Sequence, residues 1–267
     1  MPDLTITYIQ TELAWEDIPA NLALLDQKID AIENPTDLIL LPEMFSTGFS
    51  MRPAGIAESM QGSAVTWLKK KAVQTTADIA GSLMIEENGH YFNRLVWAKP
   101  DGRLYTYDKK HLFRMSGEEK IYSAGTHRLT VPLKSWRIRP FICYDLRFPA
   151  WMRNTEPFYD LAIIVANWPA AREIHWQTLL RARAIENQSY VIGVNRVGID
   201  GNQIEYNGYS CVIDFQGNVH YQHLHNACTQ TVGLSLKALQ NYRETFPAWM
   251  DRDRAVDSLF KESNENA

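Results

Sequence analysis

An unbroken apolar run, residues 161–166, constrains the fold of this chain more than any other feature of its sequence. A run of this length without polar alternation predicts a strand in a sheet that is covered on both faces. Residues 173–188 follow with the spacing of a helix, and residues 190–194 form a second apolar segment. This strand–helix–strand order indicates the α/β class.

The N-terminal part repeats the same order. Residues 4–8 alternate apolar side chains with threonines and predict a first strand. A helix is expected next, because apolar residues recur at helical spacing between residues 22 and 32, after a capping Asp17 and before Pro35. Residues 37–41 then form a short buried strand that leads directly into Pro42 and Glu43.

The rest of the chain adds hairpins to this pattern. Turn signals separate three short strands, which are predicted at residues 79–85, 91–98 and 103–107. Helix-forming sequence recurs near residues 148–154, and further strands are expected at residues 138–143, 209–214 and 219–222. Strand–helix alternation interleaved with hairpins favours a layered sandwich with its helices outside. The charged and mixed residues 235–267 are expected to form a C-terminal arm.

The composition is that of a globular protein and lacks the basic excess typical of nucleic-acid-binding proteins. Of the 267 residues, 45% are apolar and 22% are charged, so we expect an ordered chain that folds as a single domain. The net charge is −4, and the densest basic stretch, residues 69–71, is expected to be one solvated patch. A nucleic-acid partner usually requires a larger basic surface, so none is expected.

The sequence also predicts where the protein works. The first ten residues lack the basic and apolar regions of a signal peptide, and no apolar run approaches the length of about 18 residues that spans a bilayer. Three cysteines, Cys143, Cys211 and Cys228, form no disulfide framework. We therefore expect a cytoplasmic protein without membrane contact, whose thiols remain reduced.

Three residues that could carry chemistry follow predicted strands. Glu43 comes after residues 39–41, Lys109 after residues 104–107, and Cys143 after residues 141–142. Loops at strand ends are the usual place for catalytic groups in α/β sheets. Each residue alone is also typical of a solvated turn or, for the cysteine, of a small buried side chain, and spacing does not show that the three meet.

The sequence around these residues is more specific. The segments LPEMFSTGF (41–49), YDKKHLF (107–113) and FICYDLRFP (141–149) occur in this order. Together they resemble the three signature segments of the nitrilase superfamily, the carbon–nitrogen hydrolases, and residues 165–198 fit the same family. The resemblance covers about residues 3–234. It implies a four-layer α-β-β-α sandwich and a homodimer.

The resemblance also implies a catalytic triad. Glu43 matches the family's general base, Lys109 its lysine and Cys143 its nucleophile. Lys110, next to the matching lysine, is out of register. The family has a second glutamate near the site, which here is Glu118, with the neighbouring Glu119 as the alternative.

Hydrolysis of an amide explains why these residue types are needed. A carboxylate can take the proton of the Cys143 thiol, and a nearby cation favours the thiolate. The oxyanion formed by attack on a carbonyl needs donors, which Lys109 and the backbone N–H of Tyr144 can supply. The departing ammonia needs a proton, a role that suits a glutamic acid with a raised pKa. This chemistry requires no metal and no cofactor.

The substrate is implied by the branch of the superfamily. Residues 143–148 and 167–169 are most similar to the omega-amidase branch, whose members cleave the terminal amide of alpha-ketoglutaramate, also called 2-oxoglutaramate. On this reading Arg147 holds the substrate's carboxylate, for which a planar guanidinium is well suited. Trp168 and Phe45 are expected to form walls of the pocket. Arg147 could instead form a structural ion pair, and Trp168 could be core.

Several alternatives stay open at this point. A deaminated-glutathione amidase or an N-carbamoyl amide hydrolase would use the same chemistry on another substrate. Outside enzymes, a catalytically silent binding or scaffolding member and a redox-sensing thiol protein remain. A papain-like triad around Asp145 and a metal site at residues 220–225 have weaker support, because neither has the partners in sequence that it needs.

Overall fold

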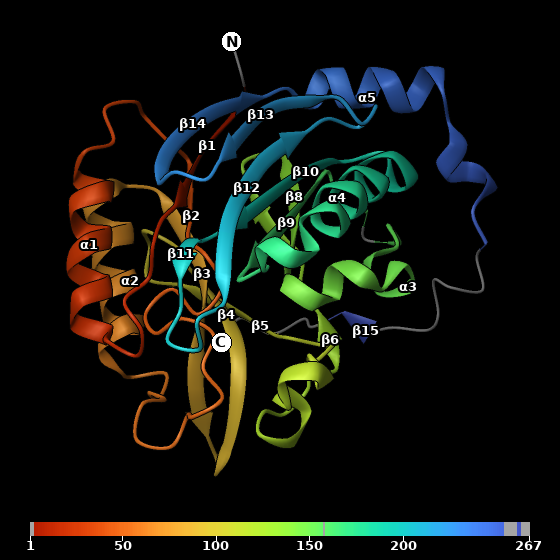
Figure 1. Ribbon diagram of the computed structural model, residues 1–267. Helices are drawn as coiled ribbons and strands as arrows, with labels where there is room; N and C mark the ends of the chain where they lie inside the picture. The colour runs from red at the N-terminus through yellow and green to blue at the C-terminus, as the bar shows by residue number, and fades with distance from the viewer. Residues whose placement is uncertain (1–2, 157, 254–260, 263–267) are drawn as a thin grey trace.

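The computed structural model describes residues 3–156, 158–253 and 261–262, and two mixed sheets dominate it (Figure 1). The first sheet has six strands in the order β14-β1-β2-β3-β4-β5. In chain order these are β1 (Leu4–Gln10), β2 (Leu38–Leu40), β3 (Asp78–Glu87), β4 (His90–Ala98), β5 (Leu104–Asp108) and β14 (Cys228–Leu234). Strand β2 pairs in parallel with β1 and β3, whereas β3, β4 and β5 form antiparallel hairpins.

The second sheet follows the order β11-β12-β10-β9-β8-β7, with β13 paired to β12. Its members are β7 (Val131–Leu133), β8 (Trp136–Ile142), β9 (Leu161–Ala166), β10 (Tyr190–Asn195), β11 (Val197–Ile199), β12 (Glu205–Ile213) and β13 (Val219–Leu224). The three central strands β8, β9 and β10 are parallel. A small pair, β6 (His127–Arg128) and β15 (Lys261–Glu262), lies outside both sheets.

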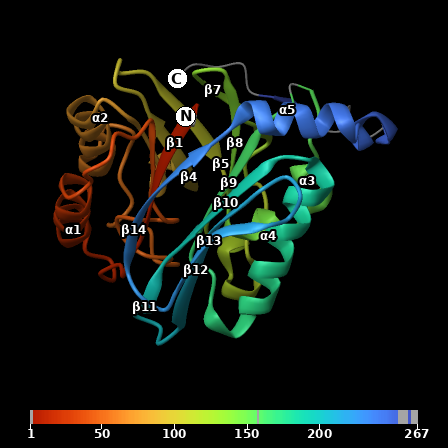
Figure 2. The same cartoon turned by 90° about the horizontal axis from the view of Figure 1, so that it is seen from above.

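Helices cover the outer face of each sheet. Helices α1 (Ile18–Asp30) and α2 (Ser63–Thr75) lie on one side of the molecule, and α3 (Pro149–Met152) and α4 (Glu173–Asn187) lie on the other (Figures 1 and 2). The two sheets face each other in the middle. This arrangement confirms the predicted four-layer α-β-β-α sandwich.

Strand β2 shows how the sequence produces these layers. Successive side chains of a strand point to opposite faces. Leu38 and Leu40 accordingly enter the core between the sheets, while Ile39 packs under α1 and α2. Strand β9 is buried throughout, as its unbroken apolar run predicts, because α4 covers the face that does not meet the other sheet.

The predicted cap of α1 is present, and the expected solvated lysine patch is present in part, because Lys69 and Lys70 are exposed but Lys71 is buried. The Asp17 carboxylate accepts a hydrogen bond from the Ala20 N–H, which satisfies one free donor of the first turn. Residues 69–71 lie in α2, and there the Lys71 ammonium is buried against Asp26 and Asp30 at 2.8 and 2.9 Å. The third lysine of the run thus joins α2 to α1 instead of facing solvent.

The C-terminal part is more structured than an arm up to residue 253. Helix α5 (Leu236–Thr245) follows β14, and its Leu239 is completely buried. Arg243 of this helix binds Asp160, which precedes β9, at 2.8 Å. The remainder of the expected arm, residues 254–260 and 263–267, lies outside the described residues. Within the described chain, no helix combines the length and apolar character needed to cross a membrane.

Candidate active site

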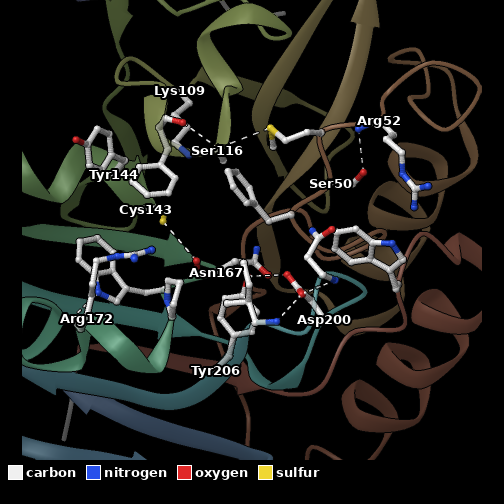
Figure 3. Close-up of a pocket in the computed structure, with 18 of the residues that line it drawn as sticks. Ser50, Arg52, Lys109, Ser116, Cys143, Tyr144, Asn167, Arg172, Asp200 and Tyr206 are labelled. Atoms are coloured by element: carbon white, nitrogen blue, oxygen red, sulfur yellow. Dashed lines mark hydrogen bonds between the residues drawn. The ribbon is translucent and has the colours of Figure 1, made fainter.

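The three strand ends singled out by the sequence meet at one pocket. Glu43 follows β2 and Lys109 follows β5 of the first sheet, whereas Cys143 follows β8 of the second sheet. Lys109 and Cys143 line a cavity of about 400 Å³ that opens between the sheets (Figure 3). The site is therefore built by both sheets together.

A buried ion cluster forms the floor of this site. The Lys109 Nζ lies 2.9 Å from Glu43 Oε1 and 3.0 Å from both carboxylate oxygens of Glu118. All three side chains are fully buried. One ammonium thus serves two carboxylates in a region that excludes water, where electrostatic interactions are strong.

Two asparagines orient the Glu43 carboxylate. The backbone N–H of Asn167, directly after β9, donates to Glu43 Oε2 at 2.7 Å, and its side-chain amide donates to the Glu43 carbonyl at 2.6 Å. Asn93 of β4 donates to Glu43 Oε1 at 2.8 Å and to Glu118 Oε1 at 3.3 Å. These donors hold the carboxylate in one position.

The second glutamate of the cluster is Glu118 and not Glu119. Glu118 begins a short 3₁₀ turn, and its Oε2 accepts a hydrogen bond of 2.6 Å from the Phe113 N–H. Glu119 instead borders a separate cavity with Lys110. The Lys110 ammonium lies 5.5 Å from the Trp151 ring and makes no contact with the cluster. The register taken from the sequence is the one that brings Lys109 to the carboxylates.

Cys143 lies at a sharp turn out of strand β8. Its φ of 44° is in the left-handed region, which a non-glycine residue adopts only at a cost, and such strain is common where a side chain must be presented to a pocket. The Sγ atom is 3.9 Å from the Asn167 carbonyl oxygen. Burial, followed by the negative charge of Glu43, raises the pKa of the Cys143 thiol well above its usual range, although Lys109 opposes this shift.

The pKa values of the neighbouring groups shift in ways that fit one shared cluster. Burial lowers the pKa of Lys109, but Glu118 and Glu43 outweigh that effect and raise it, so the ammonium stays charged. Burial also raises the pKa of Glu118, and the charge of Glu43 adds to the increase, while Lys109 opposes it. In the resting site the thiol is therefore protonated beside a charged lysine.

A second buried carboxylate, Asp145, fixes the turn that carries Cys143. Its oxygens accept hydrogen bonds from the Ile142 N–H at 3.1 Å, the Tyr107 hydroxyl at 2.6 Å and the His111 N–H at 2.9 Å. The His111 Nδ1 lies a further 2.8 Å from the same carboxylate, and its ring stacks on Phe148. Asp145 thus links the cysteine turn to the loop after Lys109.

Two of the three predicted substrate-binding residues line the pocket, together with Tyr144. Arg147 stacks over Trp168 with its guanidinium carbon 5.1 Å from the ring, and its Nη2 is 2.8 Å from His175 Nδ1. Trp168 is nearly buried, and its indole N–H donates to the Arg172 carbonyl at 2.8 Å. The alternative considered for Arg147, a structural ion pair, is not found among the described residues, where a histidine contacts its guanidinium instead.

The third predicted residue, Phe45, requires a correction. It is fully buried in the core between the first sheet and α2, where its ring lies 5.8 Å from that of Trp67. The aromatic wall on this side of the pocket comes instead from Phe49, whose ring lies 5.0 Å from the Lys109 ammonium. Phe45 and Phe49 belong to the same short segment, and the sequence pattern there does not indicate which one faces the pocket.

Sequence reasoning also missed several residues of the site. Asn93 lies inside a predicted strand, and nothing in its local pattern distinguishes it from an ordinary strand residue. Arg172 lines the pocket from within residues 165–198, which fit the family but gave this residue no role, and Asp200 and Tyr206 line it from segments that carried no motif. The histidines between residues 220 and 225 lie away from the pocket. Among the residues that the structure describes, no cluster of three or more histidine, cysteine or carboxylate side chains is arranged to hold a metal.

Comparison with known proteins gives the context for this geometry. The profile of the carbon–nitrogen hydrolase family matches residues 5–244. The chain is 49% identical to the omega-amidase YafV of Escherichia coli strain K12, over 95% of this chain and 98% of that protein. It is 31% identical to a 2-oxoglutaramate amidase of Bacillus subtilis, over 92% of this chain and 96% of that protein.

A solved structure agrees over the whole fold. XC1258 of Xanthomonas campestris, described as a CN-hydrolase superfamily protein with an arsenic adduct in its active site, matches with a TM-score of 0.92 at 44% identity. The match covers 95% of this chain and 98% of that one. Sequence and fold thus agree, and the chain belongs to the carbon–nitrogen hydrolase family of the nitrilase superfamily.

Proposed function

We propose that this protein hydrolyses the omega-amide of a small dicarboxylic acid monoamide, 2-oxoglutaramate in the first place, through Glu43, Lys109 and Cys143. The relatives named omega-amidase and 2-oxoglutaramate amidase support hydrolysis of linear amides by this chain. The observation that carries the residue assignment is the contact of Lys109 with both glutamates at the floor of a pocket that also contains Cys143.

Attack on the amide begins with proton transfer. Because the pKa of the Cys143 thiol is raised, the thiol needs a base, and Glu43 is the carboxylate whose charge acts on it most strongly. Glu43 takes the thiol proton as the sulfur bonds to the amide carbon. The carbonyl oxygen becomes an oxyanion, which accepts hydrogen bonds from the Lys109 ammonium and the Tyr144 N–H.

Collapse of this intermediate releases ammonia and leaves a thioester on Cys143. The carbon–nitrogen bond breaks, and the nitrogen takes up the proton that Glu43 received. Glu118 keeps Lys109 in place, and its raised pKa allows it to exchange a proton with the cluster during this step. Water then attacks the thioester with Glu43 as its base, and the sulfur leaves with a proton to restore the thiol.

The pocket walls suit a short substrate with one charged end. Arg147, which contacts His175, is the cation assigned to the substrate's distal carboxylate. Its guanidinium stacks on the Trp168 ring, which fixes its orientation. The aromatic and apolar lining removes water from the reacting carbonyl, which strengthens the interactions that stabilise the oxyanion.

Ammonia release from 2-oxoglutaramate by the purified protein tests this proposal. We expect turnover that Cys143→Ala abolishes while its thermal unfolding stays cooperative. Lys109→Ala should lower kcat by at least about 10²-fold, since it removes an oxyanion donor, whereas Lys110→Ala should retain activity within a few-fold. Equal losses in the two lysine variants would overturn the register, and an inert wild type that iodoacetamide still labels at Cys143 would overturn the substrate.

Two further properties belong to the proposal. The resemblance to the family favours a homodimer, which light scattering would detect as twice the chain mass of 30.7 kDa. The free thiols Cys143, Cys211 and Cys228 fit a reducing cytoplasm, where cell fractionation should find the protein. The chain is proposed to be a single domain, with about residues 3–234 as its hydrolase core.

A further inference from the structure

The cations around the pocket differ in how their charge is balanced. Arg52 lines one side and binds the Glu16 carboxylate at 2.7 Å, and Lys109 is balanced by the two glutamates of the cluster. Arg147 and Arg172 also line the pocket. Within the described part of the chain, neither of these two arginines lies within ion-pair distance of an acidic side chain.

Of these two arginines, Arg172 makes fewer hydrogen bonds through its guanidinium. The Nη2 of Arg147 is taken up by His175, whereas the guanidinium of Arg172 makes no hydrogen bond to any described residue. The guanidinium carbon lies 5.2 Å from the ring of Phe113, another pocket residue. A half-buried guanidinium whose five N–H donors have no acceptor among the described residues is a site for an anion.

The backbone holds Arg172 firmly at this place. The residue ends the 3₁₀ turn Ala170–Arg172 before α4, and its N–H donates to the Pro169 carbonyl at 3.0 Å. Its own carbonyl accepts the Trp168 indole N–H. The position of Arg172 is therefore tied to the wall of the pocket, and in Figure 3 it lies on the same side as Cys143 and Tyr144, across from Arg52.

The acidic residue of the pocket lining does not compensate Arg172. Asp200 Oδ1 accepts hydrogen bonds from the N–H groups of Asn202 and Ile204, and Oδ2 accepts the Tyr206 hydroxyl at 3.0 Å. The Asp200 carboxylate is therefore directed at donors near it in the chain and not at Arg172. An anionic group of a substrate would be repelled from Asp200 and attracted toward the two arginines, which sets a direction for the substrate in the pocket.

From this arrangement we propose that Arg172 is a specificity-determining residue that binds the distal carboxylate of the substrate together with Arg147. This inference rests on the proposed function, and it adds Arg172 to Arg147 as a second cation for the substrate's carboxylate. Two guanidiniums offer a carboxylate more than one bidentate contact, which a neutral amide of the same length cannot use. Arg172 acts at the end of the substrate remote from the reacting carbonyl, so it affects binding more than the chemical step.

Kinetics of Arg172→Gln test the proposal, with Arg181→Gln as a control of equal charge change. Arg181 lies exposed on α4 and does not line the pocket. For Arg172→Gln we expect KM for 2-oxoglutaramate to rise about 10- to 100-fold, as for loss of a charge-assisted pair, with kcat within a few-fold. Arg172→Lys should restore part of the loss, and Arg181→Gln should keep the wild-type KM.

Two more measurements separate the outcomes. In a Cys143→Ala background, calorimetry should find that Arg172→Gln weakens binding of the dicarboxylate 2-oxoglutarate by a similar factor. The uncharged reagent iodoacetamide should alkylate Cys143 of Arg172→Gln at the wild-type rate, which shows that the site is intact. If the wild type turns over 2-oxoglutaramate and Arg172→Gln keeps its KM, this inference is wrong and the proposed function stands. If the wild type does not hydrolyse 2-oxoglutaramate, both the proposed function and this inference are wrong.

Discussion

Lys109 joins the two glutamates of the site into one buried ion cluster. Its ammonium would lose much of its hydration free energy on full burial, and only the two glutamates make that burial tolerable. The same pairing leaves one excess negative charge in the cluster. Burial raises the pKa of the Cys143 thiol, and the negative charge of Glu43 adds to the increase, so the thiol stays protonated until a base removes its proton.

The reactivity of Cys143 should therefore depend on pH in a specific way. Burial and the charge of Glu43 raise the pKa of the thiol, so the thiolate that reacts with iodoacetamide forms only at higher pH. We expect the alkylation rate of the free enzyme to increase with a midpoint above about 8.5, the value of an ordinary cysteine. Glu43→Gln removes a negative neighbour and should move the midpoint to lower pH.

Mass spectrometry of the protein alkylated at a series of pH values would measure this midpoint. The Cys143→Ala variant gives the alkylation of the other cysteines, which is subtracted. Cys211 is buried, so it should contribute little to the signal. A wild-type midpoint below that of a free cysteine would mean that Lys109 dominates over the carboxylates. The description of the cluster as carrying excess negative charge would then be wrong.

At the scale of elements, the site depends on turns that connect the two sheets. Asp145 accepts hydrogen bonds from the end of β8, from Tyr107 of β5 and from the loop that holds His111. Its carboxylate is fully buried, so each of these donors would lose its partner without gaining water. One side chain thus sets the distance between the lysine loop and the cysteine turn.

Asp145→Ala should be costly for this reason. We expect the free energy of unfolding to fall by about 2–5 kcal/mol, because several buried donors are left without an acceptor. Urea denaturation followed by tryptophan fluorescence would measure the loss. Asp101→Ala provides a control, since this exposed aspartate of the β4–β5 turn binds Arg103 of the same turn, and its loss should leave the denaturation midpoint unchanged. An equal midpoint for Asp145→Ala and the wild type would show that Asp145 is dispensable.

The sequence predicts these elements unevenly, for physical reasons. Strands β2 and β9 are apolar and buried throughout, and β8 ends in the buried Phe141 and Ile142, so their patterns are clear. Glu43 follows β2 and Cys143 follows β8. Strand β14 was missed because its polar residues pair with β1 at an edge of the first sheet. Asn93 and Arg172 could not be assigned a role, since their importance arises from contacts with distant segments.

For the whole molecule, the segment β14–α5 connects the two sheets of the sandwich. Strand β14 pairs with β1 of the first sheet, and α5 then packs on the second sheet, where Tyr242 contacts Phe215. Leu236 and Trp136 both donate to the Asp3 carboxylate, which joins the start of the chain to α5 and β8. Within the described residues, the segment that follows residue 234 is thus tied to both sheets.

Arg243 tests whether α5 belongs to the cooperative fold. It donates to Asp160 Oδ1 at 2.8 Å, to the Tyr159 carbonyl at 2.8 Å and to the Gln188 carbonyl at 2.9 Å, and it is largely buried. Arg243→Ala should lower the free energy of unfolding by about 2–4 kcal/mol in one transition, because the buried Asp160 carboxylate loses this guanidinium partner and the Tyr159 and Gln188 carbonyls each lose a donor. Lys237→Ala, on the exposed side of the same helix, should leave stability unchanged in circular dichroism and fluorescence melts. If Arg243→Ala instead melts in two steps, or matches Lys237→Ala, then α5 is an appendage and the two sheets close without it.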